Sequence, residues 1–187
     1  MRMHEELIQN LQERMDKAIQ NLRREFATVR AGRAAPSMLD HVMVEYYGAQ
    51  MPVNQVASVT SPEPRLLVIS PWDKSMLSEI EKAIQKSDLG LNPANDGNVI
   101  RLTIPALTEQ RRQELVKQVR KMAEEARVAI RNIRRDGNEE IKKLEKAGDI
   151  SEDDVRRLMD RVQQLTDKAI AQVDRLLEDK EKDVTQV

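Results

Sequence analysis

Cysteine is absent from the 187-residue sequence, so the chain has neither a disulfide framework nor a thiolate metal site. Histidine is almost absent as well. His4 and His41 lie far apart, at no spacing that metal ligands use, which argues against a histidine-based zinc or catalytic site. We therefore predict that the protein holds no metal and no cofactor.

Aromatic residues make up only 2% of the chain, too few and too dispersed for a base-stacking platform. The six glycines nowhere form a phosphate-cradling loop ahead of a helix. No segment approaches the roughly eighteen consecutive apolar residues of a membrane span, and the first residues show no cleavage pattern. These absences argue against an enzyme and against a membrane protein, and they predict a cytoplasmic location.

What the sequence does contain is long amphipathic helices, since 34% of its residues are charged and 40% hydrophobic. From Thr108 to about Lys146 there is no proline, and apolar residues recur in steps of four and three. The predicted seam consists of Leu115, Val119, Met122, Ala126, Ala129 and Ile133, and it resumes at Ile141 and Leu144. Similar spacing predicts helices over residues 3 to 29 and from Ser151, a capping residue with Asp154, to about Lys182.

The segment between the first two helices has a different character, because all seven prolines lie between residues 36 and 105. Short runs rich in Val, Ile and Leu predict strands at residues 41–47, 65–70 and 98–104, with one or two more within 53–60. Asp73 is placed to cap a short helix that ends by Gly90. We expect a small α+β domain.

Together these elements predict an α+β protein, with a long antiparallel three-helix bundle and a small β/α/β domain inserted into it. The bundle takes residues 1–30 plus 106–187, and the inserted domain takes residues 31–105. The chain then crosses between the two domains twice, at residues 30–34 and 104–107. Composition alone fits a hinge and a rigid junction equally well, since glycine and proline favour a defined bend as readily as a flexible one.

The outer side of the central helix is strongly basic. Residues 111 to 135 include nine Lys or Arg and three Glu, a local charge of +6 in a chain of net charge −1. At about 100° per residue, seven of the basic side chains fall within an arc of about 140° that faces away from the apolar seam. They are Arg112, Lys117, Arg120, Arg127, Arg131, Arg134 and Arg135.

Such a face suits phosphate, because a guanidinium group can contact two oxygens at once. The alternative is a face that serves solubility only, but such a face would intersperse acids, and here only Glu124 lies within the arc. A rival of another class is a helical scaffold that recruits a second coiled coil, which requires an incompletely buried apolar stripe and self-association. We predict recognition of structured RNA by backbone shape and charge.

The sequence closely resembles the bacterial ribosome recycling factor family, nearly from end to end. Ala106 stands where a second proline is common in that family, and Val56 where leucine is common. The resemblance is carried by Arg14-Met-Asp-Lys17, Arg30-Ala-Gly-Arg-Ala34, Val44-Glu-Tyr-Tyr-Gly48, Gln55-Val-Ala-Ser-Val59, Ser87-Asp-Leu-Gly-Leu-Asn-Pro93, Leu107-Thr-Glu-Gln-Arg-Arg112, the run from Ala126 to Asp136, and Ile150-Ser-Glu-Asp-Asp154.

The resemblance implies an L-shaped protein, similar to tRNA in outline and monomeric in solution. It implies binding to the large subunit of the post-termination ribosome and, with elongation factor G and GTP hydrolysis by that partner, splitting of the subunits. By motif, Arg112, Arg131 and Arg134 correspond to the family's contacts with ribosomal RNA; Arg127 and Arg135 are added from the helical arc. The crossings correspond to the family's hinge, which here comprises Arg30, Ala31, Gly32, Arg33, Pro105, Ala106 and Leu107.

Overall fold

The computed structural model describes residues 2–29 and 32–185, which form two compact units. The first, the bundle unit, takes Met1–Ala31 and Glu109–Gln186, and the second, the inserted unit, takes Gly32–Thr108. The second boundary lies beyond the predicted one at residue 106. Leu107 belongs to the inserted unit, where its side chain lies against Gly32.

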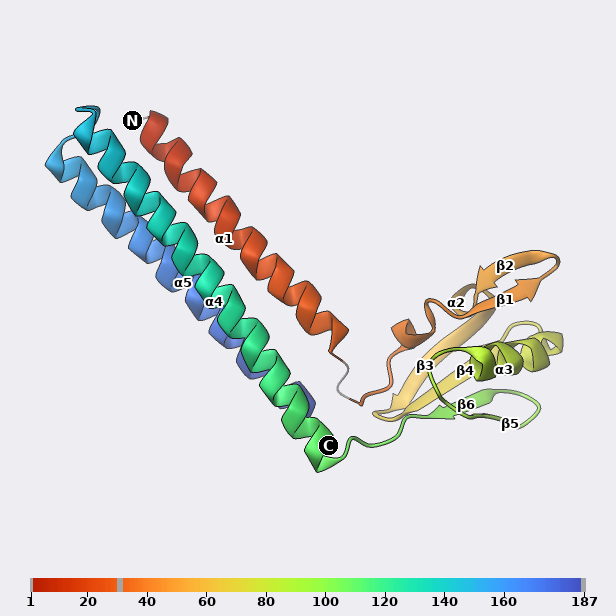
Figure 1. Ribbon diagram of the computed structural model, residues 1–187. Helices are drawn as coiled ribbons and strands as arrows, with labels where there is room; N and C mark the ends of the chain where they lie inside the picture. Colours follow the sequence, from red (N-terminus) through yellow and green to blue (C-terminus); the bar gives the residue numbers. More distant parts are fainter. Residues whose placement is uncertain (1, 30–31, 186–187) are drawn as a thin grey trace. The chain divides into compact units, whose positions relative to one another are not determined.

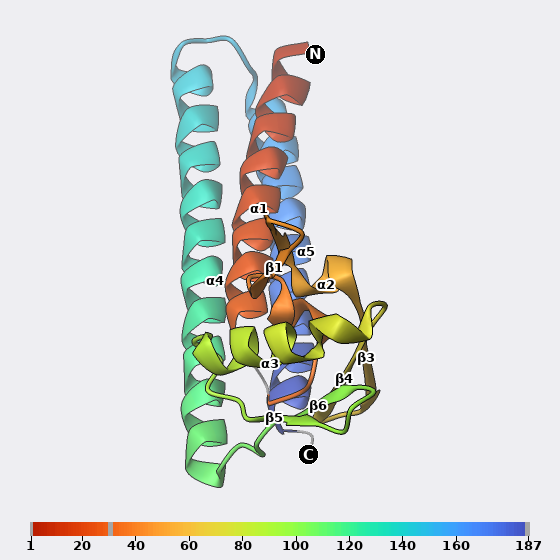
Figure 2. The same ribbon diagram turned by 90° about the vertical axis from the view of Figure 1, so that its right-hand side faces the viewer.

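The bundle unit consists of three long helices, α1 (Arg2–Thr28), α4 (Glu109–Lys146) and α5 (Glu152–Thr185). Both views show α4 running antiparallel to α1 and α5 (Figure 1, Figure 2). The predicted antiparallel three-helix bundle with an inserted mixed domain is thus confirmed. None of the helices within residues 2–29 and 32–185 combines the length and the apolarity that crossing a membrane requires.

The buried stripe of α4 differs from the predicted seam. Leu115, Val119, Ala126, Ile133 and Ile141 are buried as expected. The intervening core positions are Ala123, Ile130 and Gly137, whereas Met122, Ala129 and Leu144 are only half-buried. The sequence is compatible with two apolar stripes on α4, because the predicted and the observed stripe share most of their residues and differ only at the positions between them. The prediction was wrong at those positions. The helix is in contact with two partners, and α1 and α5 together decide which stripe is covered.

With its stripe covered from two sides, α4 leaves no open apolar seam along the described bundle. The alternative function, a helical scaffold that recruits a second coiled coil, required such a seam. Among the described residues of α4, Val128 is the one large hydrophobic side chain that is exposed. A lone exposed apolar residue is ordinary at a protein surface.

Gly137 is a point of close contact between α4 and α1. A Cβ atom built on Gly137 would lie 2.5 Å from Cδ1 and 3.1 Å from Cδ2 of Leu11, which is itself only 2% exposed. Glycine within a helix is unfavourable by about 1 kcal/mol relative to alanine, so its presence in the middle of α4 needs a reason. The reason is steric, because only a residue without a side chain lets α1 pack this closely.

Ion pairs link the outer edges of the bundle. Arg14 on α1 donates to Asp136 on α4 at 2.9 Å, and Arg161 on α5 donates to both carboxylate oxygens of Glu5 on α1 at 2.8 and 3.1 Å. These side chains are two-fifths or more exposed, so each pair contributes at most about 1 kcal/mol. Their effect is to favour one axial register of the helices.

The turn between α4 and α5 is capped as predicted. The Ser151 hydroxyl accepts a hydrogen bond from the Asp154 backbone N–H at 3.2 Å, and the Asp154 carboxylate accepts one from the Ser151 N–H at 3.3 Å. The backbone hydrogen bond from Ser151 lowers the pKa of Asp154. This reciprocal pair fixes where α5 begins.

The inserted unit consists of short helices and strands. They are 3₁₀ helix η1 (Pro36–Leu39), β1 (Met43–Tyr46), β2 (Ala49–Pro52), α2 (Val53–Val56), β3 (Ala57–Glu63), β4 (Leu66–Pro71), 3₁₀ helix η2 (Lys74–Met76), α3 (Leu77–Lys86), β5 (Pro93–Asn95) and β6 (Ile100–Thr103). The strands form a two-stranded sheet, β1–β2, and a four-stranded antiparallel sheet in the order β3-β4-β6-β5. One core cluster joins α3 to the strands through fully buried side chains such as Ile84, Leu67 and Ile100.

Four elements of this unit were not predicted as they occur, and the first is η1, where no helix was predicted. Residues 48 to 52, expected as a turn, contain β2, and Val53–Val56, expected as strand, forms a single helical turn. Strand β5 was missed, because a three-residue edge strand that begins with proline has no strand-like composition. Asp73 does act as a cap, accepting from the Ser75 N–H at 3.0 Å, although it caps η2 ahead of α3.

Replacing Gly137 by alanine is expected to destabilise the bundle by about 1 kcal/mol. The overpacking against Leu11 costs about 1–3 kcal/mol, and the gain in helix propensity of about 1 kcal/mol offsets part of it. Urea unfolding followed by circular dichroism measures the difference. In a Leu11→Ala background the clash is absent, so the same substitution should stabilise; a stabilising effect in the wild-type background would refute the close approach.

Candidate nucleic-acid interface

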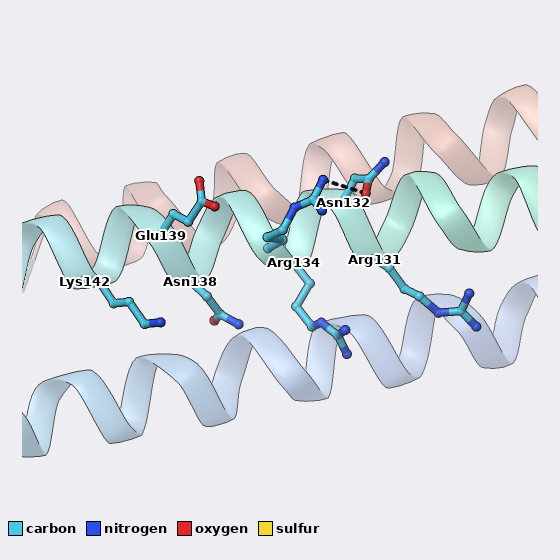
Figure 3. A pocket seen from close by; sticks show the side chains of 7 residues that line it. Arg131, Asn132, Arg134, Asn138, Glu139 and Lys142 are labelled. Carbon is cyan, nitrogen blue, oxygen red and sulfur yellow. Dashed lines mark hydrogen bonds between the residues drawn. The ribbon is translucent and has the colours of Figure 1, made fainter.

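The side chains of interest lie on the second half of α4, on the side along which α5 runs. Arg134, Asn138 and Lys142 follow one another at intervals of four residues, so they form one row along the helix. Arg131 lies one turn before this row. Figure 3 shows the side chains of all four extending toward α5, whereas Glu139 and Asn132 extend from α4 in the opposite direction.

These residues surround an open cavity of about 380 Å³. Its lining contains four cationic side chains and one carboxylate, which leaves a formal charge of +3. The lining residues are Arg131, Asn132, Arg134, Arg135, Asn138, Glu139 and Lys142. A group that fills this cavity meets mainly N–H donors and positive charge, which is the environment that a phosphate oxygen prefers.

Two of these arginines are held by neutral oxygens. The Arg135 guanidinium donates to Oδ1 of Asn132 at 3.0 Å, and the Arg134 guanidinium donates to Oε1 of Gln163 on α5 at 3.4 Å. Within residues 2–29 and 32–185, neither arginine nor Lys142 forms an ion pair. Their positive charge is therefore oriented by neighbouring residues but is not neutralised by them.

Asn138 is unusual among the lining residues. Its Oδ1 is buried and, within the described chain, has no hydrogen-bond partner, a situation that costs about 1–3 kcal/mol. Figure 3 shows its Nδ2 on the side of Arg134. With the oxygen inside and the amino group toward the cavity, the amide adds a neutral donor between two cations.

Arg127 lies in a different environment from the arginines of the cavity. Its guanidinium donates to Asp174 of α5 at 2.6 Å and to Glu124 at 3.1 Å, and its side chain is only 19% exposed. Burial on its own would lower the pKa of Arg127, but the hydrogen bonds to these two carboxylates outweigh it and raise the pKa. Arg127 thus joins α4 to α5, with its charge neutralised within the protein.

Other arginines of the predicted arc also meet carboxylates. Arg120 contacts Glu181 of α5 at 2.6 Å, Arg131 contacts Glu124 at 3.2 Å, and Arg112, 21% exposed, lies 3.7 Å from Glu109. The prediction that only Glu124 lies among these cations was wrong, because Glu109 precedes the residues that were counted and acids of α5 reach across the interhelical groove. A helical wheel of α4 alone cannot show them.

Arg127 and Arg131 share the carboxylate of Glu124, which is ionised at neutral pH. Hydrogen bonds from Arg127, and then from Arg131, lower the pKa of Glu124. Its carboxylate therefore competes with any incoming anion for Arg131, whereas Arg134 and Arg135 face no such competition.

Sequence reasoning missed Lys142 and Asn138, although a signal for both was present. They lie eight and four residues after Arg134, hence on the same helical row, but the count of basic residues stopped at Arg135. Of the predicted rRNA-binding residues, the structure brings Arg131, Arg134 and Arg135 together around the cavity and places Arg112 and Arg127 outside its lining.

The predicted hinge residues are partly described. Arg30 and Ala31 lie outside the described residues. Gly32 has a φ of +70°, and a Cβ atom built on it would lie 2.9 Å from Cγ of Leu107. Arg33, Pro105 and Ala106 are exposed. The two connecting segments therefore contact each other within the inserted unit, at Gly32 and Leu107.

The chain is similar to known proteins of one family. The ribosome recycling factor family matches residues 22–184. The ribosome-recycling factor of Carboxydothermus hydrogenoformans is 61% identical over 185 residues, covering 99% of this chain and all of that protein; that of Bacillus pumilus is 58% identical with the same coverage.

Two solved structures are also similar. A solution structure of ribosome recycling factor has 42% identity and a TM-score of 0.74, covering 98% of both chains. The second has 49% identity and a TM-score of 0.61, covering 97% of this chain and 98% of the other. That structure contains models for the T. thermophilus ribosome recycling factor and the E. coli elongation factor G bound to the E. coli post-termination complex.

The different environments of Arg127 and Arg134 predict different effects on stability. Arg127→Ala removes a mostly buried group bonded to two carboxylates and should lower the free energy of unfolding by about 1–2 kcal/mol. Arg134→Ala should change it by no more than about 0.5 kcal/mol. Urea unfolding of both variants measures this contrast, and equal losses would show that Arg134 is also structural.

Proposed function

The chain belongs to the ribosome recycling factor family, and from this we propose that it binds the large subunit of the post-termination ribosome and, with elongation factor G, splits the subunits. The single observation that supports the binding step is the cavity on α4, where Arg134, Arg135 and Lys142 have no ion-pair partner among the described residues. The ligand of this surface is ribosomal RNA, recognised through its phosphates. The protein then acts where ribosomes are, in the cytoplasm, as a monomer.

The binding surface consists of Arg131, Arg134, Arg135 and Lys142, with Asn138 as a neutral donor. Phosphate contacts of this kind fix position and orientation without reading base sequence. The scarcity of aromatic residues supports the same conclusion, since the bundle unit contains a single aromatic side chain, Phe26, which is 5% exposed. Shape and charge of folded RNA are what this face can recognise.

Arg112 and Arg127 take lesser parts in this proposal. Arg112 lines a second cavity, with Lys117 and Arg120, near the start of α4, and it extends the basic surface along the helix. Arg127, bonded to Asp174, joins α4 to α5 ahead of Arg134 and so helps to hold α5 beside the row.

The protein performs no catalysis of its own in this proposal. The energy for separating the subunits comes from GTP hydrolysis by elongation factor G, as the resemblance of the sequence implies. The bundle contributes stiffness, since α4 is packed against α1 and α5 from Leu115 to Ile141. The two connecting segments contribute a hinge, through which force on the inserted unit is converted into movement against the RNA-bound bundle.

Arg134→Ala should weaken binding to isolated large subunits by about 1.5–3 kcal/mol, because it removes charged hydrogen bonds to phosphate. The slope of log affinity against log salt should fall by about one. Co-sedimentation across a salt series measures both quantities. Arg23→Ala, which removes an exposed arginine from the α1–α5 groove, is the matched control and should leave both unchanged. Equal effects of the two variants would contradict the site.

Gly32→Ala should impair splitting more than binding. The φ of +70° and the contact with Leu107 make alanine costly by about 1–2 kcal/mol at this position. We expect unchanged affinity for large subunits and a several-fold slower splitting with elongation factor G, measured by light scattering. Gly90→Ala is the control, with a φ of +65° and open space around it. An equal slowing by both variants would attribute the loss to the stability of the inserted unit and not to the hinge.

A further inference from the structure

The turn of the β1–β2 hairpin contains a backbone conformation that its sequence does not favour. Tyr46 pairs with Ala49, so the loop consists of Tyr47 and Gly48 alone. Both have positive φ, +49° and +81°, which corresponds to a type I′ turn. Such turns favour Asn-Gly, Asp-Gly or Gly-Gly, because asparagine, aspartate and glycine tolerate left-handed backbone.

Tyr47 is the one non-glycine residue with positive φ in the described part of the chain. For a bulky residue this is a strained state, since the left-handed region brings Cβ close to the following carbonyl oxygen. Packing does not compensate for the strain, because 87% of Tyr47 is exposed. Tyr47 makes no contact that requires burial in the core, and a backbone outlier of this kind indicates a functional role.

The ring of Tyr47 is nevertheless held in place. Its centroid lies 4.5 Å from that of Tyr46, and the two planes meet at 78°, an edge-to-face arrangement that aromatic pairs prefer. Tyr46 in turn is partly buried against the core of the inserted unit. The turn that presents Tyr47 closes a separate two-stranded sheet, visible as the β1–β2 hairpin in Figure 1. An exposed aromatic ring is therefore preoriented at the tip of a short hairpin.

The charges around this ring favour a protein as its partner over RNA. Residues 32 to 108 contain six Lys or Arg and eight Asp or Glu, a net charge of −2. Strands β1 and β2 carry a single charged side chain, that of Glu45. A surface of this composition lacks the cations that bind a phosphate backbone. Tyrosine, in contrast, is enriched among the residues that dominate binding between proteins.

We infer that Tyr47 is a docking contact for a protein partner whose surface offers an apolar pocket with a basic rim. Resting on the proposed function, that partner is elongation factor G on the post-termination ribosome. The inserted unit thus meets the protein partner through the hairpin, while the bundle unit meets RNA through α4. Tyr47 contributes its ring to the contact without an induced change in the turn.

Tyr47→Asn tests the inference, because it separates stability from binding. Asparagine suits the left-handed position, so the urea midpoint of unfolding should rise. The affinity of elongation factor G, with a non-hydrolysable GTP analogue, for post-termination ribosomes carrying the variant should fall about tenfold. Tyr47→Phe keeps the ring and should retain most of the affinity. Trp72→Ala, which removes the other strongly exposed aromatic side chain of this unit, is the matched control and should retain it fully.

Several outcomes would overturn the inference. Undiminished affinity for elongation factor G would show that Tyr47 is not the contact, and a lower urea midpoint would show that the turn is not strained. Weaker binding of the Tyr47→Asn variant to isolated large subunits, without elongation factor G, would assign the contact to RNA. Failure of the proposed function looks different, because then the wild-type protein itself would not support splitting with elongation factor G.

Discussion

The burial of one stripe of α4 between α1 and α5 is the constraint on which the bundle unit depends. A helix of 38 residues can be held straight only if it is supported along its length, and the stripe from Leu115 to Ile141 provides that support. Covering this stripe determines which residues remain outside. The arginines of α4 lie on the surface because burial of the apolar residues fixes the rotation of the helix about its axis.

Contacts with α5 divide the basic surface of α4 into two parts. Toward the start of α4, acids of α5 reach Arg120 and Arg127 and neutralise them. Further along, α5 offers Gln163 to Arg134, and a neutral amide orients the guanidinium without cancelling its charge. One helix face thus serves two purposes. At Arg120 and Arg127 it contributes to cohesion between helices. At Arg134, Arg135 and Lys142 it carries positive charge that has no ion-pair partner among the described residues.

The sequence was sufficient to predict the long helices, the insertion of a small domain and the basic character of α4, because helical periodicity and proline distribution are local signals. It was insufficient for the exact stripe, since Met122 and Ala123 are both apolar and only the positions of α1 and α5 decide between them. The single turn of α2 and the edge strand β5 are too short to have a period. The pairing of Arg127 with Asp174, 47 residues away, is a tertiary contact that no pattern along α4 contains.

The neutral amide of Asn138 has one further consequence, which concerns the axial position of the bundle unit on its proposed RNA ligand. A row of like charges spaced by four residues would permit sliding, since a displacement of about 6 Å would superimpose each charge on the next. With an uncharged group between Arg134 and Lys142, the same displacement brings an amide to where a cation stood. On the ribosomal RNA proposed above as the ligand, this interruption would make one axial position of the bundle more favourable than its neighbours.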